Sequence, residues 1–125
     1  MAETVLELRR VSKAYGDRVV IRDVDLAVPG GATVAITGRS GSGKSTLFRL
    51  VAALERPTAG KVLVEGTDLA TLDDAALSRM RLRRLGIVFQ SLNLLPDLTA
   101  LQNVRLPLDI AGVPRAEADE RARRL

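Results

Sequence analysis

The chain has 125 residues, enough for one domain with an apolar core, and 46% of them are hydrophobic. It has no cysteine and no histidine, which excludes disulfides, a thiol nucleophile and the usual general base. The net charge of +4 is compatible with nucleic-acid binding. However, only 2% of residues are aromatic and acids are interleaved with the bases, so we favour a solvated arginine-rich surface.

The chain shows neither a signal-peptide pattern nor a membrane-spanning run. The first ten residues lack the signal layout, and no apolar run approaches the roughly 20 residues of a span. We therefore expect a cytoplasmic protein that meets a membrane only through a partner.

The first thirty residues alternate apolar and polar side chains in two runs. Residues 4–11 and 19–28 both have the period of two that is typical of half-buried strands. A polar turn at 12–17, which contains Tyr15, separates them, and a Pro-Gly-Gly sequence ends the second run. This pattern predicts a hairpin.

Residues 33–54 carry the strongest functional signal in the sequence. The apolar, β-branched run at 33–37 predicts a strand, and the leucines and valine from Leu47 to Leu54 have the spacing of one buried helical face. Between them, GRSGSGKS at 38–45 matches the Walker A phosphate-loop pattern G-x-x-x-x-G-K-S/T.

The residue types in this loop suit phosphate binding. Glycines permit positive φ, so successive amides can turn toward one anion, and the following helix adds free amides and its positive dipole end. Lys44 can reach the β- and γ-phosphates, Ser45 offers a hydroxyl to Mg²⁺, and Thr46 can also face phosphate. The alternative is a glycine-rich turn that binds nothing. The predicted phosphate-binding residues are Gly38, Arg39, Ser40, Gly41, Ser42, Gly43, Lys44, Ser45 and Thr46.

Shorter elements are predicted after the loop. Chain breakers occupy 55–60, a short strand is predicted at 61–65, and a helix with several arginines at 73–85. A second central strand is predicted at 87–89, just before Gln90.

The last third of the chain predicts a leucine-rich loop and two helices. The loop covers 91–99, and the next helix, at 100–111, is expected to be interrupted by Pro107. A final, solvent-facing helix starts at Pro114. Its three acid-first ion pairs at i,i+4 spacing are Glu117–Arg121, Asp119–Arg123 and Glu120–Arg124.

Four features in a fixed order resemble the ATP-binding subunits of ABC transporters. They are Tyr15 on its polar turn, GRSGSGKST, the PTAG turn with its following strand, and GIVFQSLNLLPDLTALQNVRLPL. The sequence is most similar to the branch of lipoprotein-releasing, macrolide-export and cell-division ATPases, and the resemblance covers residues 5–125.

The resemblance implies an α/β fold, the P-loop NTPase core of an ABC ATPase. Its mixed sheet would carry an antiparallel β region formed by residues 1–30 and 61–66, and the P-loop strand and helix would lie at 33–54. The Q-loop region would follow at 86–99, and residues 100–125 would form only the start of the helical subdomain. The domain would therefore be incomplete.

The resemblance also implies roles for individual residues. Tyr15 would stack on adenine, although ordinary packing in a hairpin turn is the alternative. Val20 would pack near the adenine or ribose, and a plain core position fits it equally well. Gln90 would be the Q-loop glutamine, which with Lys44 serves catalysis by approaching Mg²⁺ or the attacking water, unless it is only a polar strand end.

The leucine-rich loop would lie by the groove that receives a permease's coupling helix, unless its leucines fold back as core. The four leucines are Leu92, Leu94, Leu95 and Leu98. The implied partners are an integral-membrane permease and a second nucleotide-binding domain in a dimer, with no nucleic acid. The implied location is the inner face of the cell membrane.

Several family motifs do not occur in these 125 residues: the LSGGQ-type signature, the Walker B strand with its catalytic glutamate, and the switch histidine. Glu65 is a poor substitute for that glutamate because Gly66 turns the chain next to it. We therefore expect a truncated or split nucleotide-binding domain that binds ATP and Mg²⁺ with little turnover.

Two other functions stay open. The first is another P-loop enzyme, a GTPase or a kinase. Residues 109–112 match D-x-x-G, but Pro107 precedes them and no N-K-x-D motif follows. The second is a non-catalytic remnant that docks on a permease.

Overall fold

The computed structural model describes residues 3–125. The chain divides into two compact units, with the boundary between Arg79 and Met80. None of the helices within the described residues combines the length and hydropathy needed to span a bilayer.

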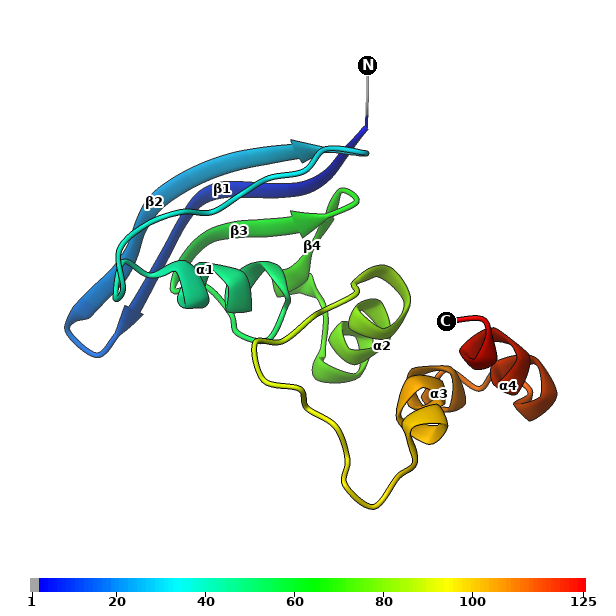
Figure 1. Ribbon diagram of the computed structural model, residues 1–125. Helices are drawn as coiled ribbons and strands as arrows, with labels where there is room; N and C mark the ends of the chain where they lie inside the picture. Colours follow the sequence, from blue (N-terminus) through cyan, green and yellow to red (C-terminus); the bar gives the residue numbers. More distant parts are fainter. Residues whose placement is uncertain (1–2) are drawn as a thin grey trace. The chain divides into compact units, whose positions relative to one another are not determined.

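The first unit is built on a four-stranded antiparallel sheet in the order β2-β1-β3-β4 (Figure 1). β1 (Thr4–Tyr15) and β2 (Arg18–Pro29) form the predicted hairpin, and both strands are longer than the sequence pattern indicated. β3 (Ala59–Val64) pairs with β1, and β4 (Thr67–Asp68) pairs with β3.

β1 and its neighbours contain a bulge where the register of the sheet shifts. Arg10 of β1 and Asp23 of β2 both have φ of 48°, in the left-handed region. At the facing position of β3, Gly60 has φ of +81°, and a Cβ there would lie 2.2 Å from the Arg10 carbonyl oxygen. The close approach of β3 to β1 therefore requires glycine at this position.

Helices cover the sheet and complete the core of this unit (Figure 1). They are α1 (Lys44–Val51), the short 3₁₀ helix η1 (Leu69–Thr71) and the start of α2 (Asp74–Arg84). The largest fully buried side chains are Leu8 and Val11 of β1, Leu50 of α1 and Val62 of β3. Helix and sheet thus share one apolar core, whose burial is the main source of stability.

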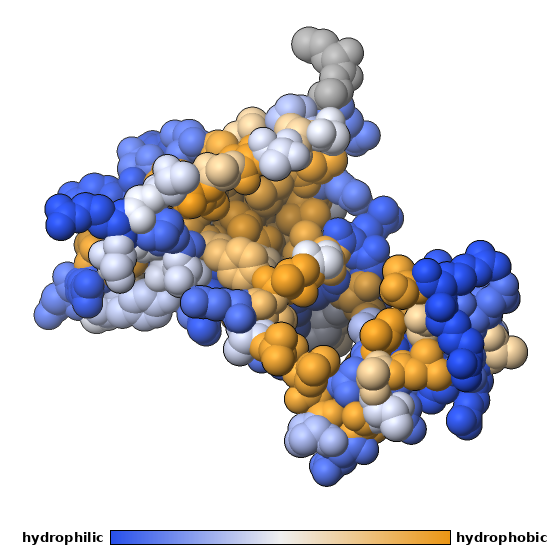
Figure 2. All heavy atoms as spheres, viewed as in Figure 1, coloured by the Kyte–Doolittle hydropathy of each residue, from blue (hydrophilic) through white to orange (hydrophobic). Residues whose placement is uncertain are grey.

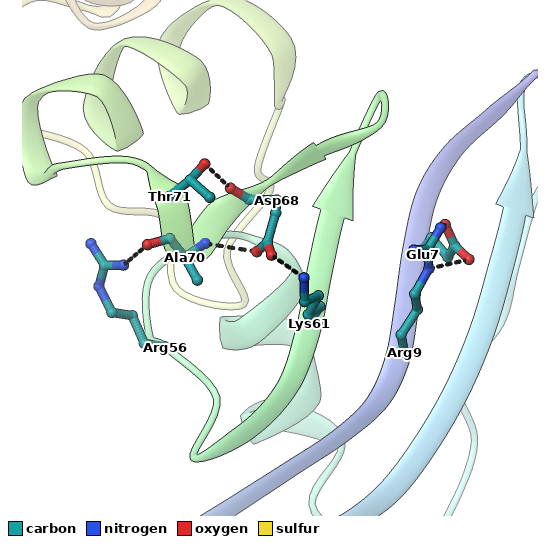
Figure 3. A network of polar contacts seen from close by, with 7 residues as sticks. All are labelled: Glu7, Arg9, Arg56, Lys61, Asp68, Ala70 and Thr71. Atoms are coloured by element: carbon teal, nitrogen blue, oxygen red, sulfur yellow. Dashed lines mark hydrogen bonds and ion pairs between the residues drawn. The ribbon is translucent and has the colours of Figure 1, made fainter.

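One carboxylate organises the corner between β4 and α2 (Figure 3). Asp68 accepts a hydrogen bond from the Ala70 amide at 3.0 Å and pairs with Lys61 Nζ at 3.4 Å. The Thr71 hydroxyl donates to the Asp68 carbonyl at 2.7 Å. These bonds fix the turn that leads the chain from the sheet into α2.

The predicted strand at 33–37 is wrong. Residues 32–39 have no strand pairing, and Val34 and Ile36 are exposed. A central parallel strand requires paired neighbours and covered faces, and no described segment pairs with this one. In Figure 2, apolar side chains gather over the sheet of this unit.

The predicted strand at 87–89 is wrong for the same reason. This segment of the second unit has no ladder partner, and Val88 is 93% exposed. The parallel part of the predicted mixed sheet is therefore not formed by the described residues.

Helix α1 ends at Val51, earlier than the predicted Leu54. Ala53 has φ of 55°, and its amide donates to the Leu50 carbonyl at 3.1 Å. The Leu54 amide donates to the Arg49 carbonyl at 2.9 Å. This is a Schellman ending, and it turns Leu54 away from the apolar helical face that the spacing predicted.

The second unit contains α3 (Ala100–Ile110) and α4 (Arg115–Arg123). Thr99 and Gln102 form a capping box that starts α3. The predicted interruption at Pro107 is wrong, because α3 continues through it. Pro107 lies on the exposed side of the helix, where water can satisfy the carbonyl that loses its amide partner.

Helix α4 is not purely solvent-facing, because it buries Ala118 and Ala122. Two of its three predicted ion pairs form, Glu117–Arg121 and Glu120–Arg124. Asp119 instead pairs with Arg105 of α3 at 2.5 Å, and Arg105 also holds Asp109 at 2.9 Å. The third predicted pair, Asp119–Arg123, is therefore replaced by a link between the two helices.

Candidate functional site

The phosphate-loop sequence folds as a tight loop that leads directly into α1. Gly43 precedes the helix with φ of +94°, and a Cβ there would lie 2.8 Å from Ile21 Cδ1 and 3.1 Å from the Val20 carbonyl oxygen. Only glycine allows the loop to approach β2 this closely with a positive φ. Among the described residues no side chain caps α1, so its first amides keep their hydrogen-bonding capacity for an anion.

Lys44 folds back over the loop that precedes it. Its Nζ donates to the carbonyl of Gly38 at 2.6 Å, to that of Arg39 at 2.7 Å and to Ser42 Oγ at 3.4 Å. All three ammonium donors are thus directed at the loop, which places a fixed positive charge beside the free amides of α1.

An open cleft of about 680 Å³ lies between this loop and the tip of the β1–β2 hairpin. The lining residues include two cations, three hydroxyl side chains, one aromatic ring and one valine, but no carboxylate. They are Tyr15, Arg18, Val20, Ser40, Gly41, Gly43, Lys44, Ser45 and Thr46.

The structure brings most of the sequence-predicted residues together here. Tyr15 and Val20 line the same cleft as the loop, and Val20 also lies against Gly43, so its role toward a nucleoside stays a prediction. Gly38, Arg39 and Ser42 contact the Lys44 ammonium without lining the cleft. Gln90 belongs to the second unit and is exposed there.

Tyr15 is held at its hydroxyl and free over much of its ring. The side chain is 46% exposed, and its Oη donates to Glu55 Oε2 at 2.5 Å. This hydrogen bond raises the pKa of the Tyr15 phenol above 10.0. It also lowers the pKa of Glu55 below 4.5, and the neighbouring charges of Arg49 and Lys13 act in the same direction.

Sequence reasoning missed one cleft residue, Arg18. It is paired opposite Tyr15 in the hairpin register and lines the cleft. The structure gives its guanidinium no hydrogen bond or ion pair with residues 3–125. The signal was present in the sequence: a two-residue Gly16-Asp17 turn places residues 15 and 18 directly across from each other.

The cleft fits a nucleoside polyphosphate and its metal ion. Two cations, free helix amides and hydroxyl groups suit the phosphates, and an exposed aromatic ring suits a base. No three acidic side chains of the described residues gather as a metal site. Ser45 offers a hydroxyl that would share a Mg²⁺ ion with phosphate oxygens, the arrangement that Mg²⁺ usually adopts with nucleotides.

A protein-family model described as ABC transporter matches residues 21–125. The chain therefore belongs to the ABC transporter family. The match covers the phosphate loop and the segment around Gln90, and it confirms the resemblance to ABC transporter ATP-binding subunits.

Two curated relatives illustrate the range of similar proteins. The chain is 47% identical over 129 residues to the lipoprotein-releasing system ATP-binding protein LolD 2 of Caulobacter vibrioides, covering 100% of this chain and 57% of that protein. It is 46% identical over 121 residues to the methionine import ATP-binding protein MetN of Rhodopseudomonas palustris, covering 97% of this chain and 32% of that protein. The chain thus spans about half of the first relative and about a third of the second.

The fold is that of an ABC ATPase cassette. The dimeric structure of a post-hydrolysis state of the ATP-binding cassette MJ0796, bound to ADP and Pi, superposes with a TM-score of 0.83 at 38% identity. The match covers 94% of this chain and 53% of that one. The predicted α/β ABC cassette fold is confirmed.

Proposed function

We propose that this chain binds Mg·ATP as the ATP-binding part of an ABC transporter subunit. The observation that carries the proposal is the cleft itself, in which an exposed aromatic ring faces a phosphate loop with a fixed lysine. The match to a cassette whose structure holds ADP and Pi supports it.

In this proposal the loop residues from Gly38 to Thr46 bind the phosphates. The amides at the start of α1 and the Lys44 ammonium supply hydrogen bonds and positive charge, and Lys44 exchanges loop carbonyls for β- and γ-phosphate oxygens. Ser45 would hold Mg²⁺ together with phosphate oxygens, and the ion would neutralise charge on the phosphates. The metal-binding role of Gln90 stays a prediction from the sequence.

The hairpin side of the cleft binds the nucleoside. Tyr15 stacks on the adenine with Val20 beside it, and Arg18 adds positive charge at the hairpin tip. Stacking on a tyrosine favours an aromatic base without reading its edges. Preference for adenine over guanine is therefore expected to be moderate.

For this chain we propose ATP binding with little turnover. Phosphoryl transfer needs an oriented water as well as charge neutralisation. The 125 residues contain Gln90 and Lys44 for these tasks but no histidine and no SGGQ run.

In the intact transporter we propose a cytoplasmic subunit at the inner membrane face, working as a dimer with a permease. The dimeric MJ0796 cassette supports the dimer, and the LolD 2 relative supports lipoprotein release or export as the coupled process. The similar identity to MetN leaves methionine import as the competing transport process.

The leucine-rich loop supports permease docking as a second candidate function. Leu92, Leu94 and Leu95 are all exposed, so the interpretation that these three fold back as core is not favoured. Co-purification with a permease should persist in Lys44→Ala if docking is independent of ATP. Its loss in that variant would contradict independent docking.

Isothermal calorimetry of the full chain with Mg·ATP tests the main proposal. We expect binding that Lys44→Ala abolishes while circular dichroism shows an unchanged fold. No heat from folded wild-type protein would contradict ATP binding, and a strong preference for GTP would favour the GTPase alternative. Robust ATP hydrolysis that depends on Lys44 would contradict the proposed low turnover.

A further inference from the structure

We propose that Glu55 is a positioning residue that sets the Tyr15 ring for the base of the bound nucleotide. This role rests on the proposed ATP binding. It assigns a carboxylate beyond the end of α1 to the base-binding side of the cleft, although Glu55 itself does not line the cleft.

The first step of the argument is that the Tyr15 ring needs an anchor. Tyr15 is the last residue of β1, directly before the hairpin turn, and nearly half of its side chain is exposed. Packing alone does not fix such a ring. Its hydroxyl donates a 2.5 Å hydrogen bond to Glu55, which holds the far end of the ring. The Thr46 side chain of α1 also interacts with the phenol.

The second step is that Glu55 is itself held firmly. Arg49 Nε lies 2.6 Å from Glu55 Oε1, and Lys13 Nζ lies 3.5 Å from Oε2. The Glu55 side chain is only 19% exposed, and its amide donates to the Arg49 carbonyl at 3.2 Å. Glu55 is thus tied to Arg49 through both backbone and side chain.

The third step is that Arg49 belongs to α1, the helix that begins with Lys44 and Ser45. One rigid helix therefore carries the phosphate-binding groups at its start and, through Arg49 and Glu55, the anchor of the Tyr15 ring at its end. This link fixes the distance between the base-stacking ring and the phosphate loop before a nucleotide arrives. Such preorganisation lowers the ordering cost of binding.

Lys13 fixes which face of the ring is available. Its Nζ lies over the Tyr15 ring, 5.1 Å from the centroid, and is itself held by the Arg56 carbonyl at 2.8 Å. One face of the ring is therefore taken by a cation, so a base must stack on the other.

The test compares a ligand that has a base with one that has none. Calorimetry on the full chain measures the affinities for Mg·ATP and for magnesium tripolyphosphate. Glu55→Ala should weaken Mg·ATP binding by roughly 3- to 10-fold, the cost of ordering one side chain, and leave tripolyphosphate binding unchanged. Glu55→Gln, whose amide oxygen still accepts the phenol hydrogen, should recover most of the loss.

Glu7→Ala is the matched control. It also removes a glutamate from an arginine pair, since Glu7 binds Arg9 at 2.8 and 2.7 Å on β1 (Figure 3), but neither residue lines the cleft. It should leave both affinities unchanged. Equal loss of ATP and tripolyphosphate binding in Glu55→Ala, or no loss at all, overturns the positioning role.

A second measurement needs no ligand. Tyr15 is the chain's one tyrosine and there is no tryptophan, so ultraviolet absorbance follows its ionisation alone. Because Glu55 raises the pKa of Tyr15, Glu55→Ala should lower that pKa toward 10.0. An unchanged titration curve overturns the contact. Wild-type protein that binds tripolyphosphate but not ATP overturns the proposed function, and the positioning role falls with it.

Discussion

At the scale of single residues, two glycines show how backbone conformation shapes this protein. Gly43 and Gly60 both combine positive φ with a neighbour too close for a Cβ. The first seats the phosphate loop on β2, and the second lets β3 approach the bulge of β1. Other positive-φ glycines, such as Gly66, face open space.

Gly60→Ala should destabilise the first unit by about 2–4 kcal/mol, because its Cβ would meet the Arg10 carbonyl in addition to the φ strain. Gly66→Ala is the matched control. It has a similar φ of +76° with nothing within 4 Å, so it should cost only about 1 kcal/mol. Urea unfolding curves measure both variants, and equal losses would contradict the close approach.

Arg18→Ala should weaken Mg·ATP binding by about 2- to 5-fold, because an exposed cation next to phosphates contributes a modest attraction. The difference from wild type should shrink as salt is raised, since exposed charges are screened. Arg22→Ala on the same strand but outside the cleft lining is the control. A salt-independent loss would indicate a packing role instead.

At the scale of elements, local sequence signals were sufficient for some parts and insufficient for others. The hairpin, α2 and the helix that follows Pro114 follow from alternation, periodicity and caps, which act within a few residues. The segments at 33–37 and 87–89 have the composition of strands but pair with no other strand among the described residues. Strand pairing depends on neighbouring segments, so local composition alone does not predict it.

The candidate site was predictable to a similar extent. The phosphate loop and Tyr15 were found because their signals are local. Arg18 needed the hairpin register, and Glu55 needed a contact across 40 residues of sequence. The early end of α1 depends on Ala53, which adopts a left-handed conformation. Glycine usually occupies such a position, so the sequence gives no signal for this helix end.

The link between α3 and α4 should depend on pH. Arg105 lowers the pKa of Asp119 below 3.8, so the link stabilises the folded state above pH 3.8 and its contribution disappears as pH falls through the lowered pKa. Asp119→Asn should therefore be less stable than wild type at pH 7 and equal to it in strong acid. Amide exchange in α4 measures this, with Glu117→Gln as a control for an exposed pair within α4. A stability difference between Asp119→Asn and wild type that persists below the lowered pKa would contradict this pH dependence.

At the scale of the whole molecule, each of the two units exposes large apolar side chains. Val34, Ile36, Val88 and Phe89 all lie in segments with strand composition and no pairing. An unpaired apolar segment is a site where other strands can add.

Val88→Ser should change the unfolding free energy by less than about 0.5 kcal/mol, because the side chain is 93% exposed. Leu50→Ala, in the fully buried core, should cost about 2–5 kcal/mol. Denaturant unfolding measures both. A large cost for Val88→Ser, rising with protein concentration, would show that copies of the chain cover this segment.

The Schellman ending of α1 has a consequence for how the protein tolerates changes in length. Three residues, Ala52 to Leu54, return the chain from helix to Glu55, and the amides of Leu54 and Glu55 both bond to the Arg49 carbonyl. Adding or removing one residue there would swing the carboxylate out of reach of the phenol while leaving helix and strands intact. In the proposed base site, the length of this short reversal therefore sets where the Tyr15 ring is held.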